Sequence, residues 1–174
     1  MTFDTFQNSE ALRFGYGETA LGIAVVATGP NGIVALFIGD DREKLRRDLR
    51  NTFPHAEFIY DQAGLADTIA KAVRLIDAPH RVSDLALDLR GSPLELAVWR
   101  ALQAIPPGET RSYGALARAL PLAATAQEVG AACAANRIAV AIPCHRIVKA
   151  DGSISGYRWG VSRKRRLINM EAVA

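Results

Sequence analysis

Cysteine, histidine and long apolar runs are all scarce in this chain of 174 residues. It has two cysteines and three histidines, with no cluster of them at metal-ligand spacing, so we predict reduced thiols and no metal site. No apolar run approaches the roughly 18 residues of a membrane-spanning helix. The start of the chain, Met1-Thr2-Phe3-Asp4, is unlike a secretory signal. These absences argue against secreted, membrane-spanning and zinc-stabilised proteins and favour a cytoplasmic one.

Charge is divided unevenly between the two halves of the chain. Residues 1–87 carry 9 Lys and Arg against 12 Asp and Glu, a balance of −3, whereas residues 88–174 carry 12 against 6, a balance of +6. The second half is therefore the one suited to a polyanion. The run Arg163-Lys164-Arg165-Arg166 either adds to that surface or forms an ordinary solvated helix face, and the sequence leaves both open.

The first half has the mixture of short strands and amphipathic helices that is typical of a small α/β domain. We expect strands at 12–16, 22–28, 33–38 and 84–89 and helices at 42–51 and 64–76. The turn signal Gly29-Pro30-Asn31-Gly32 joins two of the strands into a hairpin. Asp40 or Asp41 can cap the first helix, and Pro54 ends it. Nothing in this half identifies a function.

The second half is predicted to be mostly helical. Ser92 can cap a helix that has Pro93 at its first position, so we divide the chain into domains at 1–90 and 91–174. Two shorter helices, at 112–120 and 126–135, follow with a tight turn between them, as in a helix-turn-helix.

The second helix of that pair is nearly bare of side chains. Its small residues are Gly130, Ala131, Ala132, Ala134 and Ala135. A helix that reads bases in the major groove needs long polar side chains, whereas a bare one suits close approach to a narrow groove. Burial against neighbouring elements would favour small residues equally, and composition does not choose between the two.

Cys144 is the most informative residue of the chain. It follows Pro143 and precedes His145 and Arg146. Nearby positive charge favours the thiolate, so the thiol is a candidate for a lowered pKa and for a nucleophile. The alternative is a buried cysteine that only fills space in an apolar run.

Four segments of the second half together resemble the O6-alkylguanine-DNA alkyltransferases. They are Ile105-Pro106-Pro107-Gly108-Glu109-Thr110-Arg111-Ser112-Tyr113, Ala132-Cys133-Ala134-Ala135-Asn136, Ile142-Pro143-Cys144-His145-Arg146 and 151–160. The likeness is strong over about residues 90–171 and is greatest to the C-terminal half of bacterial adaptive-response proteins. Without the cysteine-rich zinc half of those proteins, the chain is expected to be a free-standing version.

The resemblance implies a fold and an activity. The fold is α+β, with a small ribonuclease-H-like α/β domain followed by a mostly helical, winged-helix-like domain that contains the helix-turn-helix. The activity is repair of alkylated double-stranded DNA by a monomer that needs no cofactor, metal or obligate protein partner. The damaged nucleotide is swung out of the helix, and its alkyl group passes from O6 of guanine, or O4 of thymine, to the protein in a single turnover.

The resemblance also implies roles for individual residues. Cys144 would be the nucleophile, His145 the base acting through a water, and Glu171 the group that orients His145. Asn136 would brace the turn before the thiol, and the Tyr113 hydroxyl would donate to N3 of the flipped base. The implied base-binding residues are Tyr113, Cys133, Cys144, Ile147, Ser155, Gly156 and Tyr157. The implied DNA-binding residues are Thr125, Ala126, Gln127, Gly130, Ala131, Ala134 and Arg137.

One position departs from the family pattern. Where the family has an arginine that fills the gap left by the flipped base, this chain has Gln127, followed by the acidic Glu128. We expect Gln127 to fill that gap less well. Three other functions stay open: a cysteine hydrolase, a lesion sensor that transfers nothing, and a transcriptional regulator. The presence of Cys144 argues against the sensor, and the bare helix argues against the regulator.

Overall fold

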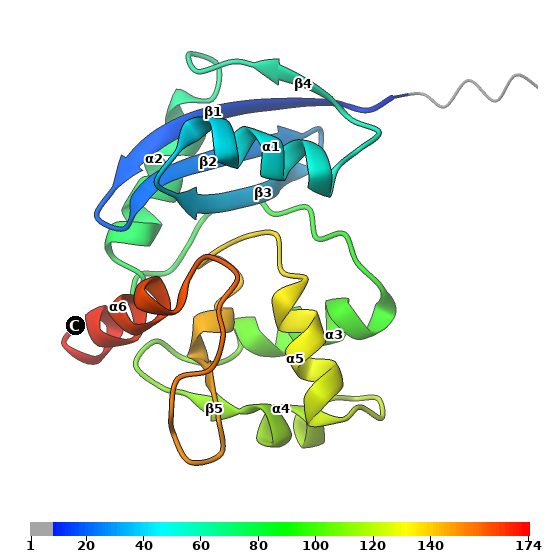
Figure 1. Ribbon diagram of the computed structural model, residues 1–174, viewed down its shortest axis with the longest axis vertical. Helices are drawn as coiled ribbons and strands as arrows, with labels where there is room; N and C mark the ends of the chain where they lie inside the picture. The colour runs from blue at the N-terminus through cyan, green and yellow to red at the C-terminus, as the bar shows by residue number, and fades with distance from the viewer. Residues whose placement is uncertain (1–8) are drawn as a thin grey trace, which may run out of the picture.

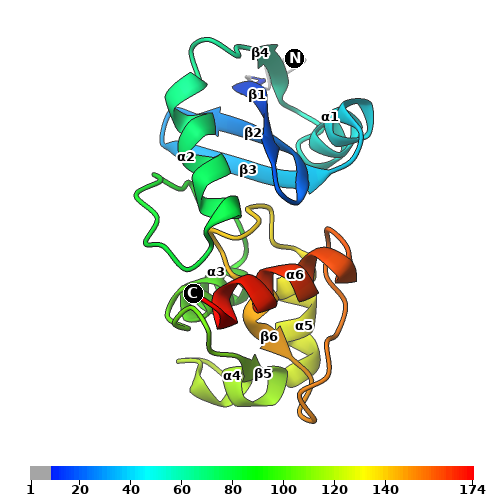
Figure 2. The same ribbon diagram turned by 90° about the vertical axis from the view of Figure 1, so that its left-hand side faces the viewer.

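The structure is a computed structural model that describes residues 9–174. Residues 1–8, including the chain start Met1–Asp4 discussed above, lie outside the described part. Figures 1 and 2 show two units stacked along the long axis, one built around a sheet and one mostly helical. This arrangement confirms the predicted α+β class. No helix in the described part of the chain is long and apolar enough to cross a membrane.

The first unit is a four-stranded mixed sheet with a helix on each face. Its strands are β1 (Ala11–Thr19), β2 (Gly22–Gly29), β3 (Gly32–Gly39) and β4 (Glu57–Tyr60), in the order β3-β2-β1-β4. Strands β1, β2 and β3 are antiparallel neighbours, whereas β4 runs parallel to β1. Helix α1 (Arg42–Thr52) and helix α2 (Ala66–Asp77) cover opposite faces (Figure 2).

Glycines let α2 lie close to the sheet. A Cβ atom on Gly15 or Gly17 would come within 3.0 Å of Ile69 or Val73 of α2. At the turn between β2 and β3, Gly32 has φ +134°, which a side chain would strain, and the Ala86 carbonyl lies 2.5 Å from the place of its Cβ. Because β2 and β3 pair as antiparallel strands through this turn, the predicted hairpin is confirmed.

One prediction for this unit is wrong, and one strand was missed. Residues 84–89 form no strand, since only Leu87 bridges to Ile33. The segment instead covers the open edge of β3 with two hydrogen bonds, Ile33 N–H to Ala86 O (2.9 Å) and Asp88 N–H to Ile33 O (2.8 Å). Strand β4 was not predicted, because four residues of which three are largely exposed show no burial pattern.

The second unit consists of short helices and a two-stranded parallel ladder. Its elements are α3 (Pro93–Gln103), β5 (Arg111–Ser112), α4 (Tyr113–Ala119), α5 (Ala126–Ala134), the 3-10 helix η1 (Cys144–Arg146), β6 (Ile147–Val148) and α6 (Val161–Ala172). Capping boxes start α3 at Ser92 and α5 at Thr125. The three predicted helices are confirmed to within two residues, and α4 and α5 form the expected helical pair.

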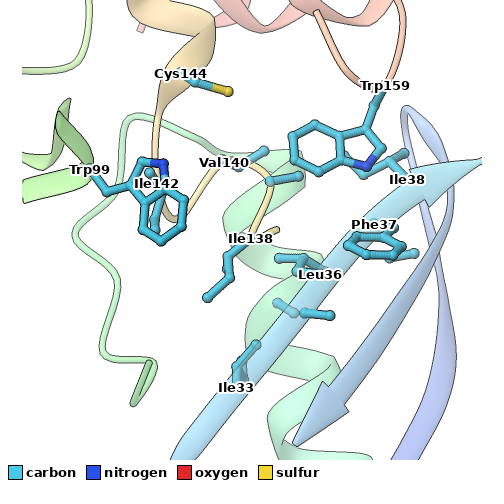
Figure 3. Close-up of a cluster of buried hydrophobic side chains, with 14 of the residues drawn as sticks. Ile33, Leu36, Phe37, Ile38, Trp99, Ile138, Val140, Ile142, Cys144 and Trp159 are labelled. Carbon is cyan, nitrogen blue, oxygen red and sulfur yellow. The ribbon is translucent and has the colours of Figure 1, made fainter. Parts of the chain in front are cut away.

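A continuous apolar core joins the two units. Side chains of β3, among them Leu36 and Phe37, lie beside Ile138, Val140 and Trp159 of the second unit (Figure 3). Two backbone hydrogen bonds of 2.9 Å, Leu36 N–H to Arg137 O and Ala139 N–H to Leu36 O, extend the edge of β3 into that segment. The segment that leads to Cys144 is thus built directly onto the sheet.

The basic run of α6 also joins the units. Arg163 donates to the Leu21 carbonyl and to Asp40, both at 2.7 Å, and Arg166 donates to the Ala20 carbonyl at 2.9 Å. Lys164 is 1% exposed. The prediction of a solvated face is wrong for Lys164, which is buried, whereas Arg165 and Arg166 are exposed. Arg163 and Arg166 also bind the first unit, which neither interpretation of this run foresaw.

Candidate active site

Cys144 lies at the start of η1, at the wall of a cavity of about 340 Å³. Its side chain is largely buried, and its sulfur accepts a hydrogen bond from the Asn136 side chain, with 3.2 Å between Nδ2 and Sγ. The Cys144 N–H bonds the Ile142 carbonyl at 2.8 Å. The thiol is thus fixed against a hollow rather than packed into solid core.

Asn136 organises the turn that leads to the thiol. It is fully buried; Nδ2 also donates to the Ile142 carbonyl (2.9 Å), and Oδ1 accepts from the Ile138 N–H (2.9 Å). Within this turn Val140 has φ +67°, a strained value for a β-branched residue. The three hydrogen bonds of Asn136 hold a turn that the backbone alone would not favour.

Behind the thiol lies a buried group of three charged or polar side chains. His145 Nε2 is 2.7 Å from Glu171 Oε1, and the Arg146 guanidinium donates to both Glu171 oxygens at 2.8–3.1 Å. Arg146 also donates to the Ile105 carbonyl at 2.7 Å. The His145 Nδ1 atom is buried and has no hydrogen-bond partner within residues 9–174. The predicted association of Glu171 with His145 is present, and Arg146 is an addition that the sequence did not indicate.

The charges of this group follow from its contacts. Burial would raise the pKa of Glu171, but hydrogen bonds from His145 and Arg146 outweigh it and lower that pKa to about 2. Burial lowers the pKa of His145 despite the neighbouring Glu171. Because an ionised carboxylate only accepts hydrogen bonds, Nε2 carries the proton of the neutral imidazole and Nδ1 keeps a free lone pair. His145 is therefore arranged as a base.

The predicted lowering of the Cys144 pKa is wrong for the resting protein. Burial raises the pKa of this thiol to about 11, and the hydrogen bond from Asn136 and the charge of Lys164 offset burial only in part. The sequence argument failed because Arg146 points at Glu171 instead of the sulfur, and because buried His145 is neutral. The thiol is therefore protonated at neutral pH in the resting protein.

Most of the predicted base-binding residues line the same cavity. Its walls are formed by Tyr113, Gly130, Cys133, Ala134, Cys144, Gly156, Tyr157 and Arg158. Two predicted residues are not in the cavity wall: Ile147, which is fully buried, and Ser155, whose hydroxyl group is hydrogen-bonded to that of Tyr113. Both cysteines are free. A side chain at Gly130 would begin 3.8 Å from the Tyr113 ring, so this glycine keeps the hollow open.

The predicted DNA-binding residues divide into three sets. Thr125, the N-cap of α5, and Ala126, Gln127 and Ala131 of that helix are exposed. Gly130 and Ala134 of the same helix line the cavity. Glu128 accepts from the Thr125 N–H at 3.1 Å as part of the capping box, which accounts for an acidic residue there. Arg137 lies over the Phe53 ring of the first unit, 5.2 Å from its centroid.

Lys164 is the site residue that the sequence did not reveal. Its Nζ donates to Ser155 Oγ at 3.0 Å and to the Gly156 carbonyl at 3.3 Å. The only signal was its spacing: Lys164, Leu167 and Glu171 are the buried residues of α6 and follow the i, i+3, i+7 stripe of a buried helix face. The part of the chain that the structure describes has no group of three metal-binding side chains.

Comparison with known proteins gives consistent matches. Residues 93–173 match the family described as 6-O-methylguanine DNA methyltransferase, DNA binding domain. The "Bifunctional transcriptional activator/DNA repair enzyme Ada" of Escherichia coli (strain K12) is 40% identical over 162 residues, which are 93% of this chain and 46% of that protein. The inducible methylated-DNA–protein-cysteine methyltransferase of Bacillus subtilis (strain 168) is 31% identical over 149 residues, 84% of this chain and 82% of that protein.

Solved structures agree over the whole chain. The O6-methylguanine methyltransferase of Mycobacterium tuberculosis superposes with a TM-score of 0.75 at 28% identity, covering 93% of each chain. A structure of the Mycobacterium tuberculosis protein OGT in complex with DNA gives 0.71 at 29% identity, covering 94% of this chain and 93% of that one. The chain spans about half the length of several curated relatives that it matches.

Proposed function

Because the chain belongs to the family of methylated-DNA–protein-cysteine methyltransferases, we propose that it moves the alkyl group of O6-alkylguanine in double-stranded DNA onto its own Cys144. One observation carries the proposal. The Cys144 sulfur lies at the wall of a cavity, with an amide N–H on one side and a buried His145–Glu171 pair beside it. A cysteine that only filled space would need neither the cavity nor the base.

His145 activates the thiol. Its Nδ1 lone pair is free, because Glu171 fixes the proton on Nε2. A water between Nδ1 and the thiol carries the Cys144 proton to His145, and the negative Glu171 stabilises the imidazolium that forms. With a thiol pKa of about 11, this transfer provides the thiolate that the resting protein lacks at neutral pH.

The thiolate then displaces the alkyl group from O6 in line. The new S–C bond forms as the C–O6 bond breaks, and the electron pair stays on the purine, where the Tyr113 hydroxyl hydrogen-bonds N3. Ser155, Gly156 and Tyr157 belong to the loop that borders the base, and the Cys144 and Ile147 carbonyls accept from its exocyclic amine. The thioether has no route back to a thiol, so each molecule reacts once.

DNA binding follows from the same arrangement. The damaged nucleotide leaves the helix and enters the cavity, while the exposed residues of α5 lie in the minor groove and Gln127 fills the vacancy. Gly130 and Ala134 sit where the groove meets the cavity. The protein acts as a cytoplasmic monomer without a cofactor.

Intact mass measurement tests the reaction. Incubation with a duplex that contains a single O6-methylguanine should add one methyl group per protein molecule, mapped to Cys144. The guanine should remain in the DNA without its methyl group. Cys144→Ser should gain nothing, and peptide mapping of the unsubstituted protein should find the methyl group on Cys144 and none on Cys133. Tight binding of the damaged duplex without any mass gain would show a lesion sensor instead. Repeated turnover of an ester without loss of the thiol would show a hydrolase.

A further inference from the structure

Lys164 is a buried cation without a counterion. It is 1% exposed, and within residues 9–174 it forms no ion pair with a carboxylate. Its two hydrogen-bond partners are neutral oxygens, of the Ser155 hydroxyl and the Gly156 carbonyl. An unpaired charge is costly to bury, which makes Lys164 a candidate for a role beyond packing. The mechanism above gives it none.

The contacts of Lys164 continue into the cavity through a second hydroxyl group. Ser155 Oγ, which accepts from Lys164, is also hydrogen-bonded to the Tyr113 hydroxyl. An ammonium group only donates, so the lone pair of Ser155 that faces Lys164 is occupied. Ser155 has one hydrogen left to donate, and Tyr113 is the partner next to it. Tyr113 lines the cavity, whereas Ser155 does not.

Either hydroxyl group can be the donor of the Tyr113–Ser155 hydrogen bond, because Ser155 Oγ has a second lone pair. When Ser155 donates to the Tyr113 oxygen, the Tyr113 hydrogen is free to point into the cavity. Chains of hydrogen bonds polarise one another, and a charged donor at one end strengthens every link. The positive charge of Lys164 thereby makes the Tyr113 hydroxyl group a stronger hydrogen-bond donor toward the cavity, although Lys164 itself does not line the cavity.

We propose that Lys164 is a positioning residue for alkyl transfer: through Ser155 it directs the Tyr113 hydroxyl toward the departing purine and strengthens its hydrogen bond. The proposal rests on the proposed function. As the C–O6 bond breaks, the electron pair moves onto the purine, and the Tyr113 donor stabilises the charge that develops there. No proton moves along the chain, and the purine takes its proton from solvent after transfer.

A comparison of two electrophiles tests the proposal, with modification of Cys144 distinguished from that of Cys133 by peptide mapping. One is the O6-methylguanine duplex, whose purine leaving group needs a hydrogen-bond donor. The other is iodoacetamide, whose iodide leaving group needs none. The variants are Lys164→Met, which keeps the length of the side chain without its charge, Ser155→Ala and Tyr113→Phe. Rates of Cys144 modification are read by mass at several pH values.

Lys164→Met and Ser155→Ala should each slow the DNA reaction by about tenfold or more relative to the iodoacetamide reaction, since one donor aimed at developing charge contributes roughly 10²–10³ in rate. In the Tyr113→Phe background, neither change should slow the DNA reaction further. Should Lys164→Met not fold, Ser155→Ala carries the same comparison.

Three results would overturn the proposal. Equal slowing of both electrophiles would place the effect of Lys164 at the sulfur. A full effect that persists in Tyr113→Phe would place it in the loop around Gly156. No slowing at all would leave Lys164 without a role in the reaction. Failure of the unsubstituted protein to gain a methyl group from the duplex would instead contradict the proposed function itself, before any variant is compared.

Discussion

Replacing Glu171 by glutamine should weaken the fold and the reaction together, because one carboxylate holds both Arg146 and His145. The amide keeps the size of the side chain but not its charge. Arg146 is 6% exposed and has no other acidic partner among the described residues. Breaking a buried ion pair by removing one partner costs about 3–5 kcal/mol, which is a large part of the roughly 5–15 kcal/mol that a domain has.

The pH dependence of that loss is specific. Glu171 has a pKa of about 2 in the folded protein, below its ordinary 4.5, so the carboxylate stabilises the fold above about pH 4.5. That contribution is lost as the pH falls from 4.5 toward 2. Urea unfolding of the protein and of Glu171→Gln should therefore differ most near pH 7 and converge at low pH. The charge-preserving Glu171→Asp serves as the control and should lose less stability at pH 7.

The same variant should slow methyl transfer. Without the carboxylate, the imidazolium of His145 is not stabilised and its tautomer is not fixed, and loss of a positioned base costs about 10²–10⁴ in rate. The rate is measured in a single turnover at low temperature, where the variant stays folded. A Glu171→Gln protein that equals the unsubstituted one in stability at pH 7 would refute the ion-pair argument. An unchanged transfer rate would refute the assignment of His145 as the base.

Four further outcomes are expected. Asn136→Ala leaves the Ile138 N–H without a partner, whereas the Ile142 carbonyl keeps the Cys144 N–H, and it should cost about 1–3 kcal/mol in urea unfolding, the cost of one unsatisfied buried group; a loss below about 0.5 kcal/mol would contradict this. Gly32→Ala forces a side chain onto φ +134° against the Ala86 carbonyl and should lower the Tm by several degrees, whereas Gly152→Ala, with open space around it, should lower it less. Because the Cys144 pKa is raised to about 11, its reaction with iodoacetamide should rise about tenfold per pH unit and still be rising at pH 10; a plateau below pH 9 would show an ordinary thiol. Gln127→Arg should speed repair by roughly tenfold at low salt, since a charged donor contributes about 1.5–3 kcal/mol. No gain at any salt concentration would contradict the expectation that Gln127 fills the gap left by the flipped base less well than an arginine.

Local signals in the sequence were reliable where the structure is decided locally. Ser92 and Thr125 each have a glutamate three residues later, and both form capping boxes. The Gly29–Gly32 turn was equally predictable. Such features depend on a few neighbouring residues, which the sequence displays directly.

Features decided by tertiary contacts could not be predicted. Residues 84–89 alternate like a strand but lie along an edge that only the folded sheet creates. The charge beside Cys144 depends on which way Arg146 turns, and the partner that turns it, Glu171, is 25 residues away. Lys164 was hidden among three arginines, although its spacing to Leu167 placed it on the buried stripe.

The anchoring of α6 on the sheet has a consequence for cutting the chain. The helix that carries Lys164 and Glu171 is tied through Arg163 and Arg166 to the hairpin turn between β1 and β2, more than 140 residues earlier. A fragment that starts at residue 93, where the family match begins, would retain Cys144, His145 and Glu171. It would lose the hydrogen bonds of Arg163 and Arg166 to the hairpin turn and the apolar contacts with β3. We therefore expect the smallest active fragment to be larger than the family match at residues 93–173, and a graft of that segment onto another protein to need a substitute for the β1–β2 hairpin.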